Sequence, residues 1–280
     1  MTRESRPTKK KQKVKVELTR RDFLTLAATA AGSVVAAQAL TTGPLSPFAA
    51  LKQSQITGEA HGVSHGDYHW GMVIDLDRCI GCEYCLRACN ATNDVNAAEP
   101  WNIVVPNTTS TGRRFFFSRP CLHCQHAPCV EVCPVRATYV REDGVVVMDY
   151  DRCIGCRYCE VACPYDARRF NWQARADSNP YVPTWGLPEV ERRPRGVVEK
   201  CTFCIQRIDY GLEKNLTPGE DYEATPACVN ICPVGARIFG NLADPTSRVS
   251  QVIAGNPTLR LRQELGTDPS VYYIPPKEGL

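Results

Sequence analysis

The sequence predicts an α+β fold built from two small, cysteine-rich units, and three observations support this prediction. All 16 cysteines of the 280-residue chain fall between Cys79 and Cys232, in four groups of four. The stretch 73–89 recurs as the stretch 147–163, which indicates that one structural unit occurs twice. Two β-prone runs flank an Asp-Gly turn at 141–144, and this pattern predicts a hairpin between the second and third groups.

An export signal, rather than a fold element, begins the chain. A lysine-rich leader precedes the paired arginines Arg20 and Arg21, and an apolar segment, 23–40, follows them directly. Paired arginines before an apolar run are typical of the twin-arginine export route. Small and polar residues dilute the segment, so it would be a poor permanent membrane anchor. We expect a twin-arginine signal peptide over residues 1–39 and a linker over residues 40–69; an amphipathic N-terminal helix is the alternative.

In the rest of the chain, the charge argues against nucleic-acid binding and the hydropathy argues against a membrane-spanning helix. The sequence has 33 Lys and Arg against 30 Asp and Glu, but residues 1–39 hold nine of the former and three of the latter. The remainder has a formal net charge of 24 minus 27, or −3, and no basic stripe, so nucleic acid is not an expected partner. No later segment reaches the roughly 18 to 20 apolar residues of a spanning helix. The mature chain is therefore expected to have no membrane span of its own.

Cysteine spacing indicates iron–sulfur ligation. The first and third groups read C-x2-C-x2-C-x3-C, which is the ligand run of bacterial ferredoxins. The second group has a longer middle gap, and the fourth consists of two separated pairs. Glycines at Gly81 and Gly155 relieve the backbone where three thiolates must close around one cluster. In chain order the groups are Cys79, Cys82, Cys85 and Cys89; Cys121, Cys124, Cys129 and Cys133; Cys153, Cys156, Cys159 and Cys163; and Cys201, Cys204, Cys228 and Cys232.

Zinc and disulfide bonds are the alternatives for these cysteines. A zinc ribbon uses two separated pairs and has no need of a third cysteine two residues further on. Disulfides are common in exported proteins, but crowded cysteines of this kind would gain nothing from them. Clusters also account for the export route, because they are assembled in the cytoplasm and their thiolate ligands would oxidise if exported unfolded.

The cysteine groups are expected to exchange ligands. In two-cluster ferredoxins the fourth cysteine of a run ligates the other cluster. Groups two and three should therefore exchange Cys133 and Cys163, and groups one and four should exchange Cys89 and Cys232. This predicts two bacterial-ferredoxin-like units related by pseudo-twofold symmetry, with long connecting loops. The expected boundaries are 70–115 with 195–245 for the first unit, 116–194 for the second unit with a docking loop, and 246–280 for a C-terminal extension.

The arrangement resembles the four-cluster iron–sulfur electron-transfer subunit of the molybdopterin oxidoreductase superfamily, as in dimethyl sulfoxide, polysulfide and tetrathionate reductases, formate-dependent nitrite reductase and sulfite-reduction-associated complexes. The most specific motifs are CIGCRYCEVACPYDAR at 153–168, EKCTFC at 199–204 and PAC at 226–228, within a resemblance over 70–273. The insert 212–225 departs from the commoner members. The resemblance implies four [4Fe-4S] clusters on these ligand sets: Cys79, Cys82, Cys85 and Cys232; Cys201, Cys204, Cys228 and Cys89; Cys121, Cys124, Cys129 and Cys163; Cys153, Cys156, Cys159 and Cys133.

The resemblance further implies a non-catalytic electron-transfer subunit of an oxidoreductase complex. It would relay electrons between a molybdopterin-containing catalytic subunit and an integral membrane quinol-interacting subunit or cytochrome, at the periplasmic face of the membrane. The sequence agrees, because it contains no nucleophile–base pair, phosphate loop or dinucleotide fingerprint. A diffusible periplasmic multicluster ferredoxin and a structural or metal-storage protein are the alternatives. The segment 171–194, rich in proline and aromatic residues, suits a docking surface and favours the subunit.

Four further polar residues have two interpretations each. His123 and His126 lie among the second-group cysteines, where they either contact a cluster sulfur or face solvent. Lys200 and Arg207 flank the first pair of the fourth group, where they either offset cluster charge or are solvated at the surface.

Overall fold

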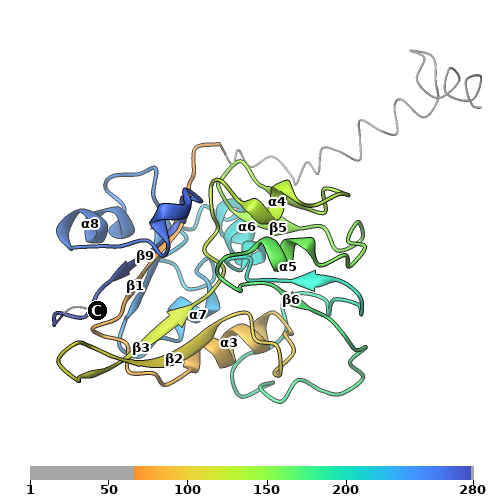
Figure 1. The fold of residues 1–280 in the computed structure, drawn as a ribbon, viewed down its shortest axis with the longest axis horizontal. Coiled ribbons are helices and arrows are strands. Elements are labelled where there is room, and N and C mark those ends of the chain that lie inside the picture. The colour runs from red at the N-terminus through yellow and green to blue at the C-terminus, as the bar shows by residue number, and fades with distance from the viewer. Residues whose placement is uncertain (1–65, 279–280) are drawn as a thin grey trace, which may run out of the picture. The chain divides into compact units, whose positions relative to one another are not determined.

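The computed structural model describes residues 66–278 of the chain. The predicted signal, with Arg20 and Arg21, and most of the predicted linker lie outside these residues. Short helices and short strands are interspersed through the described part (Figure 1). In chain order the elements are β1 (Trp70–Asp75), α3 (Tyr84–Thr92), β2 (Ile103–Thr108), β3 (Arg114–Arg119), α4 (Pro128–Glu131), β4 (Thr138–Val140), β5 (Val146–Met148), α5 (Tyr158–Ala162), β6 (Arg169–Phe170), β7 (Val198–Glu199), α6 (Ile205–Glu213), α7 (Ala227–Asn230), β8 (Arg237–Asn241), α8 (Arg248–Gly255), the 3-10 helix η1 (Gln263–Leu265) and β9 (Val271–Ile274).

A three-stranded sheet joins the two ends of the described chain. Its central strand is β1, with β8 antiparallel on one side and β9 parallel on the other, and Figure 1 shows β1 beside β9. Met72 and Ile74 belong to the main core, whereas Val73 packs against Val249 of α8. Side chains alternate across a strand, so β1 is covered on both faces. The segment 246–280 thus contributes both a covering helix and an edge strand to this sheet.

The repeated sequence folds in the same way twice. Asp75 and Asp149 occupy equivalent positions before the cysteine loops, and each side chain accepts hydrogen bonds from the N–H groups two and three residues later. Gly81 and Gly155 have φ angles of 74° and 67°, which confirms that both loops need glycine. A Cβ at Gly155 would lie 2.1 Å from the carbonyl oxygen of Gly196, so no side chain fits there.

The predicted hairpin and the short helices after the cysteine loops are confirmed. Strands β4 and β5 pair antiparallel, with Tyr139 opposite Val147. Helix α4 begins at Pro128, where the missing proline N–H costs no helical hydrogen bond. Helix α5 occupies the equivalent place after the third-group loop. Two antiparallel pairs that the sequence did not predict, β2–β3 and β6–β7, complete the strands.

The helices that carry cysteines pack in two pairs. Helix α3, with Cys85 and Cys89, packs against α7, with Cys228. Helix α4, with Cys129, packs against α5, with Cys159, and Figure 1 shows these two helices close together. The first cysteine group therefore lies beside the fourth, and the second lies beside the third. None of the helices within 66–278 is long and apolar enough to span a bilayer.

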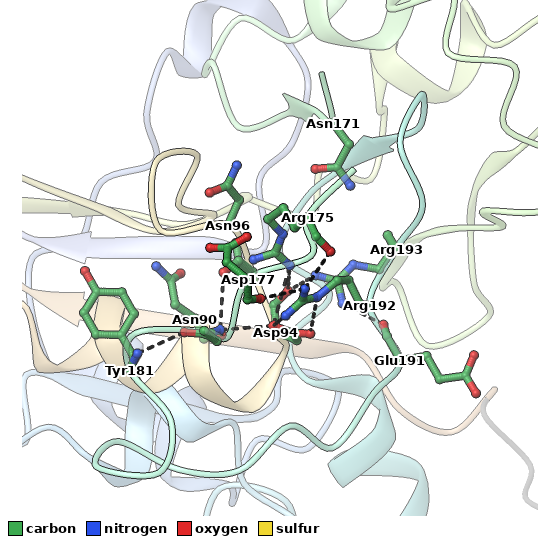
Figure 2. A network of polar contacts seen from close by, with 12 residues as sticks. Asn90, Asp94, Asn96, Asn171, Arg175, Asp177, Tyr181, Glu191, Arg192 and Arg193 are labelled. Carbon is green, nitrogen blue, oxygen red and sulfur yellow. Dashed lines mark hydrogen bonds and ion pairs between the residues drawn. The ribbon is translucent and has the colours of Figure 1, made fainter. Parts of the chain in front are cut away.

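The carboxylate of Asp94 is one anchor of the segment 171–194 (Figure 2). Asp94 Oδ2 accepts a hydrogen bond from Arg192 Nε at 2.8 Å, and Oδ1 accepts one from Asn179 Nδ2 at 3.2 Å. Arg175 Nη2 lies 3.6 Å from Oδ1. Burial opposes ionisation, but the hydrogen bonds from Arg192 and Asn179 outweigh it and lower the pKa of Asp94. The charged side chain of Asp94 therefore holds the segment at Arg175, Asn179 and Arg192.

Asp94→Asn should loosen this segment. Asparagine tolerates the positive φ of 42° at this position, but it has no charge to hold Arg192 and Arg175. Loss of charged hydrogen bonds costs about 2 kcal/mol, which corresponds to roughly thirtyfold more frequent local opening. Hydrogen exchange of the amides in 171–194 measures this change. Asp177→Asn is the charge-matched control, because Asp177 is exposed on the same segment; equal exchange in the two variants would contradict the anchoring role.

Candidate iron–sulfur sites

An enclosed cavity lies between the first cysteine loop and the residues after α7. Three cysteines of the first group line it, and the fourth cysteine in its wall comes from the last group. These four are Cys79, Cys82, Cys85 and Cys232. Four sulfur atoms from opposite ends of the cysteine-rich sequence therefore surround one small volume.

A second enclosed cavity has the same composition in the other half of the cysteine-rich region. It is lined by three cysteines of the second group and the last cysteine of the third. These four are Cys121, Cys124, Cys129 and Cys163. At two separate cavities, three cysteines of one group and one cysteine of another therefore line the same volume.

Cys89, the last cysteine of the first group, is buried near three cysteines of the fourth group. Burial raises the pKa of the Cys89 thiol well above its ordinary value, and the charges of Cys201, Cys204 and Cys228 raise it further. Asn93 bridges two members of this set, because its Nδ2 lies 3.7 Å from Cys89 Sγ and 3.5 Å from Cys204 Sγ. The structure therefore brings these four cysteines together.

The remaining set is only partly enclosed. Cys159 is buried, and burial raises the pKa of its thiol to about 11. Cys153 and Cys133 are among the residues whose charges act on it. Cys156, on the same loop as Cys153, is exposed. One of the four cysteine sets is therefore open to the surface.

Backbone N–H groups point at the cysteines that precede proline. Ala137 N donates to Cys133 Sγ at 3.2 Å, and Ala236 N donates to Cys232 Sγ at 3.3 Å. In each case the donor lies four residues after the cysteine, so the Cys-Pro turn presents an amide to the sulfur. Hydrogen bonds of this kind stabilise the thiolate form and influence a cluster's potential.

The donor sets fit [4Fe-4S] clusters. All 16 cysteines lie within the described residues and none forms a disulfide, contrary to the disulfide alternative. Burial raises the pKa of Cys124, Cys201 and Cys228 to about 12, so these thiols ionise at neutral pH only when a cation compensates the charge. Iron supplies that charge. Two of the cavities are each lined by four cysteines, the number of thiolates that a [4Fe-4S] cluster takes.

Two of the polar residues singled out in the sequence are buried between the cysteine sites. His123 is fully buried, so the solvent-facing interpretation is wrong for it. Its ring stacks on Phe203 with centroids 3.7 Å apart, and Nδ1 accepts a hydrogen bond from Val146 N. Lys200 is also fully buried, and Nζ donates to the carbonyl oxygens of Val146 and Cys201. Surface solvation is therefore excluded for Lys200 as well.

The other two lie further out. His126 is exposed, in agreement with the solvent-facing interpretation. Arg207 forms an ion pair with Glu189 at 2.5 Å and so has a protein partner for its charge.

The insert 212–225 is held by hydrogen bonds of its own. Thr225 Oγ1 accepts a hydrogen bond from Gly219 N and donates one to a backbone carbonyl.

Three side chains that contact cysteine sulfur were not assigned a role from the sequence. They are Asn93, Arg168 and Arg237. The sequence does contain a shared pattern around the two arginines. Each follows a Cys-Pro-x-x-Ala sequence, which begins at Cys163 for Arg168 and at Cys232 for Arg237. Asn93 lies in no comparable motif. Its role depends on the packing of α3 against the fourth group.

Comparison with protein families agrees with the cysteine sites. Models of 4Fe-4S dicluster domains match residues 113–179 and 152–236, and a 4Fe-4S binding domain matches residues 70–91. A further model, described as the twin-arginine signal of the ubiquitinol–cytochrome c reductase Fe–S subunit, matches residues 11–42. The predicted twin-arginine signal is thus confirmed at the level of the family model.

Comparison with individual proteins gives close matches over most of the chain. An iron–sulfur subunit from Halobacterium salinarum, named for dimethyl sulfoxide reductase, is 46% identical over 74% of this chain and 79% of its own length. The iron–sulfur cluster-binding subunit of menaquinone reductase from Nitratidesulfovibrio vulgaris is 42% identical, covering 75% of this chain and 89% of its own. A polysulfide reductase subunit from Wolinella succinogenes is 37% identical, covering 75% and 96%.

Proposed function

This chain belongs to the iron–sulfur subunit family of the molybdopterin oxidoreductase superfamily, and we propose that it is the electron-relay subunit of a respiratory complex. It passes single electrons between a molybdopterin-containing catalytic subunit and an integral membrane quinol-interacting subunit or cytochrome. The names of the relatives support this assignment, since they include subunits of a menaquinone reductase and of a polysulfide reductase.

The observation that carries the proposal is that cysteines from different sequence groups lie together around the same cavity. Two enclosed cavities each take three cysteines from one group and one from another. The packing of α3 on α7 and of α4 on α5 supports two ferredoxin-like units arranged about a pseudo-twofold axis. The proposed ligand sets are Cys79, Cys82, Cys85 and Cys232; Cys201, Cys204, Cys228 and Cys89; Cys121, Cys124, Cys129 and Cys163; and Cys153, Cys156, Cys159 and Cys133.

Each set holds one [4Fe-4S] cluster, which accepts and releases a single electron when bound. The chain's own residues donate hydrogen bonds to the ligand sulfurs and exclude water. The amides of Ala137 and Ala236 donate to ligand sulfurs, and buried apolar side chains such as Leu122 and Phe203 enclose the sites. A rigid, dry surrounding reduces the solvent rearrangement that accompanies a change of charge.

An exposed apolar surface beside the fourth set supports docking to a partner. Ile154, Tyr158 and Val161 surround the exposed Cys156 in sequence, and Val161 is 87% exposed. Trp172, at the start of the segment 171–194, is also exposed. Apolar side chains gathered in this way mark interaction sites. A surface next to a partly open cysteine set is suited to electron exchange with another protein, and the twin-arginine signal supports a location of the complex at the periplasmic face of the membrane.

Purified alone, the mature chain should exchange electrons with redox dyes but convert no physiological substrate. All 16 of its cysteines are assigned as cluster ligands, so none is left free to act as a nucleophile. Addition of the molybdopterin subunit and the membrane subunit should restore electron flow from one to the other, measured as quinone-linked turnover. Cys156→Ala should interrupt that flow while dye-linked turnover by the catalytic subunit persists.

Two results would contradict the proposal. Substrate turnover by the isolated chain without molybdenum or a second protein would require an active site on this chain. Equal electron delivery to unrelated acceptors, together with no stable association with either subunit, would favour the diffusible ferredoxin.

A further inference from the structure

Arg168 is a buried cation between two cysteine sets. It is 1% exposed, and its Nη2 donates to Cys129 Sγ at 2.9 Å and to Thr138 Oγ1 at 2.9 Å. Its Nη1 lies 2.9 Å from the sulfur of Met148. The guanidinium also interacts electrostatically with Cys159, which belongs to the neighbouring set. The guanidinium therefore contacts a sulfur of one proposed cluster site and lies within electrostatic range of the neighbouring site.

Arg237 occupies the equivalent place in the other half. It is 4% exposed, and its Nη1 lies 3.4 Å from Cys228 Sγ and 3.5 Å from the sulfur of Met72. Its Nη2 donates to Asn102 Oδ1 at 2.8 Å and to Ser118 Oγ. It also interacts electrostatically with Cys85, a member of the adjacent set. Cysteine sulfur, methionine sulfur and a hydroxyl group thus recur around both arginines.

Neither arginine has a carboxylate partner. Within 66–278, the ion pairs of the structure involve other arginines and Lys277, whereas Arg168 and Arg237 contact only sulfur and neutral oxygen. A buried charge is costly unless an opposite charge compensates it. The groups at hand that become negative are the cysteine ligands. A purely structural role would be met by a neutral side chain that satisfied the same hydroxyl groups.

We infer that Arg168 and Arg237 are potential-setting residues, each shared by the two cluster sites of one ferredoxin-like unit. The inference rests on the proposed ligation. An added electron makes a site more negative, so a fixed cation nearby stabilises the reduced state and raises the reduction potential. The effect is larger in the protein interior than at the surface, because the effective dielectric constant is lower. Arg237 acts on the sites that contain Cys85 and Cys228, and Arg168 on those that contain Cys129 and Cys159.

The test is a redox titration of the full-length, cluster-loaded protein, followed by electron paramagnetic resonance. Arg168→Gln should lower two of the four midpoint potentials, and Arg237→Gln should lower the other two. We expect at least a tenfold fall in the ratio of reduced to oxidised cluster at a fixed potential, which is about 59 mV for one electron. Arg136→Gln is the matched control. Arg136 follows Cys133 by three residues and is exposed, so this variant removes the same charge at a solvent-exposed position.

A second variant separates charge from shape. Arg168→Lys keeps the positive charge but loses the planar fork, so its midpoints should stay close to those of the unchanged protein. Midpoints are read from whichever molecules retain their clusters, so partial loss of iron leaves the measurement intact. The inference is overturned if the glutamine variants shift no more than Arg136→Gln, if both shift the same clusters, or if Arg168→Lys shifts as far as Arg168→Gln. Failure of the unchanged protein to bind four clusters would instead overturn the proposed function.

Discussion

Cys232→Ala removes the cluster site built on Cys79, Cys82 and Cys85, and it leaves the site built on the other fourth-group cysteines in place. This is the expected result of the exchange of ligands, because Cys232 lines the same cavity as those three first-group cysteines. Alanine has no ligand atom, so the loss should amount to one cluster of iron per chain. Iron content and the number of resonance signals after reduction measure it.

Double variants identify which site is lost. Cys232→Ala combined with Cys79→Ala should lose no more iron than either change alone, because both residues serve one site. Cys232→Ala combined with Cys201→Ala should lose two clusters, because these residues serve different sites. Non-additivity of this kind is the signature of residues that act as a unit. The opposite pattern would show that ligation follows the sequence groups and would rule out the exchange.

Replacement of both Arg20 and Arg21 by lysine should abolish export and leave cluster-loaded protein in the cytoplasm. The paired arginines are the address of the twin-arginine route, whereas the cysteine sites lie in a separate part of the sequence. Cell fractionation measures the location of the protein, and the absorbance of iron–sulfur clusters near 400 nm measures their loading. We expect almost no protein in the periplasmic fraction.

The matched control is Arg3→Lys with Arg6→Lys, which makes the same chemical change upstream in the same leader. The chain should be expressed without its partner subunits, because a partner with its own signal could carry the chain across. Normal periplasmic delivery of the Arg20→Lys, Arg21→Lys protein under these conditions would contradict the twin-arginine prediction.

Local features of the fold could be predicted because local sequence determines them. The hairpin of β4 and β5 follows from β-prone runs around an Asp-Gly turn, and the positive φ at Gly81 and Gly155 follows from the geometry of a tight cysteine loop. The short helices α4 and α5 likewise begin where the cysteine loops end. In each case the contacts that decide the structure lie within a few residues.

Features that depend on distant contacts could not be predicted in this way. The parallel pairing of β9 with β1 joins Val271 to Met72, and no local pattern specifies that partner. Lysine is a residue type usually found at the surface. The burial of Lys200 follows from the packing of the hairpin against the fourth group. Arg237 is similar: its position after Cys232 is visible in the sequence, but its contact with Cys228 sulfur arises only in the folded chain.

The central position of β1 has a consequence for synthesis of the protein on the ribosome. Its neighbours β8 and β9 begin at Arg237 and Val271, so both are translated long after Trp70. At roughly 5 to 20 residues per second, β1 waits on the order of ten seconds or more for its first partner strand. Translation of the hairpin of β4 and β5 is complete well before then. A chain whose synthesis stops before Arg237 therefore has an unpaired, largely apolar strand at Trp70–Asp75, and only a chain translated through Ile274 can close the sheet.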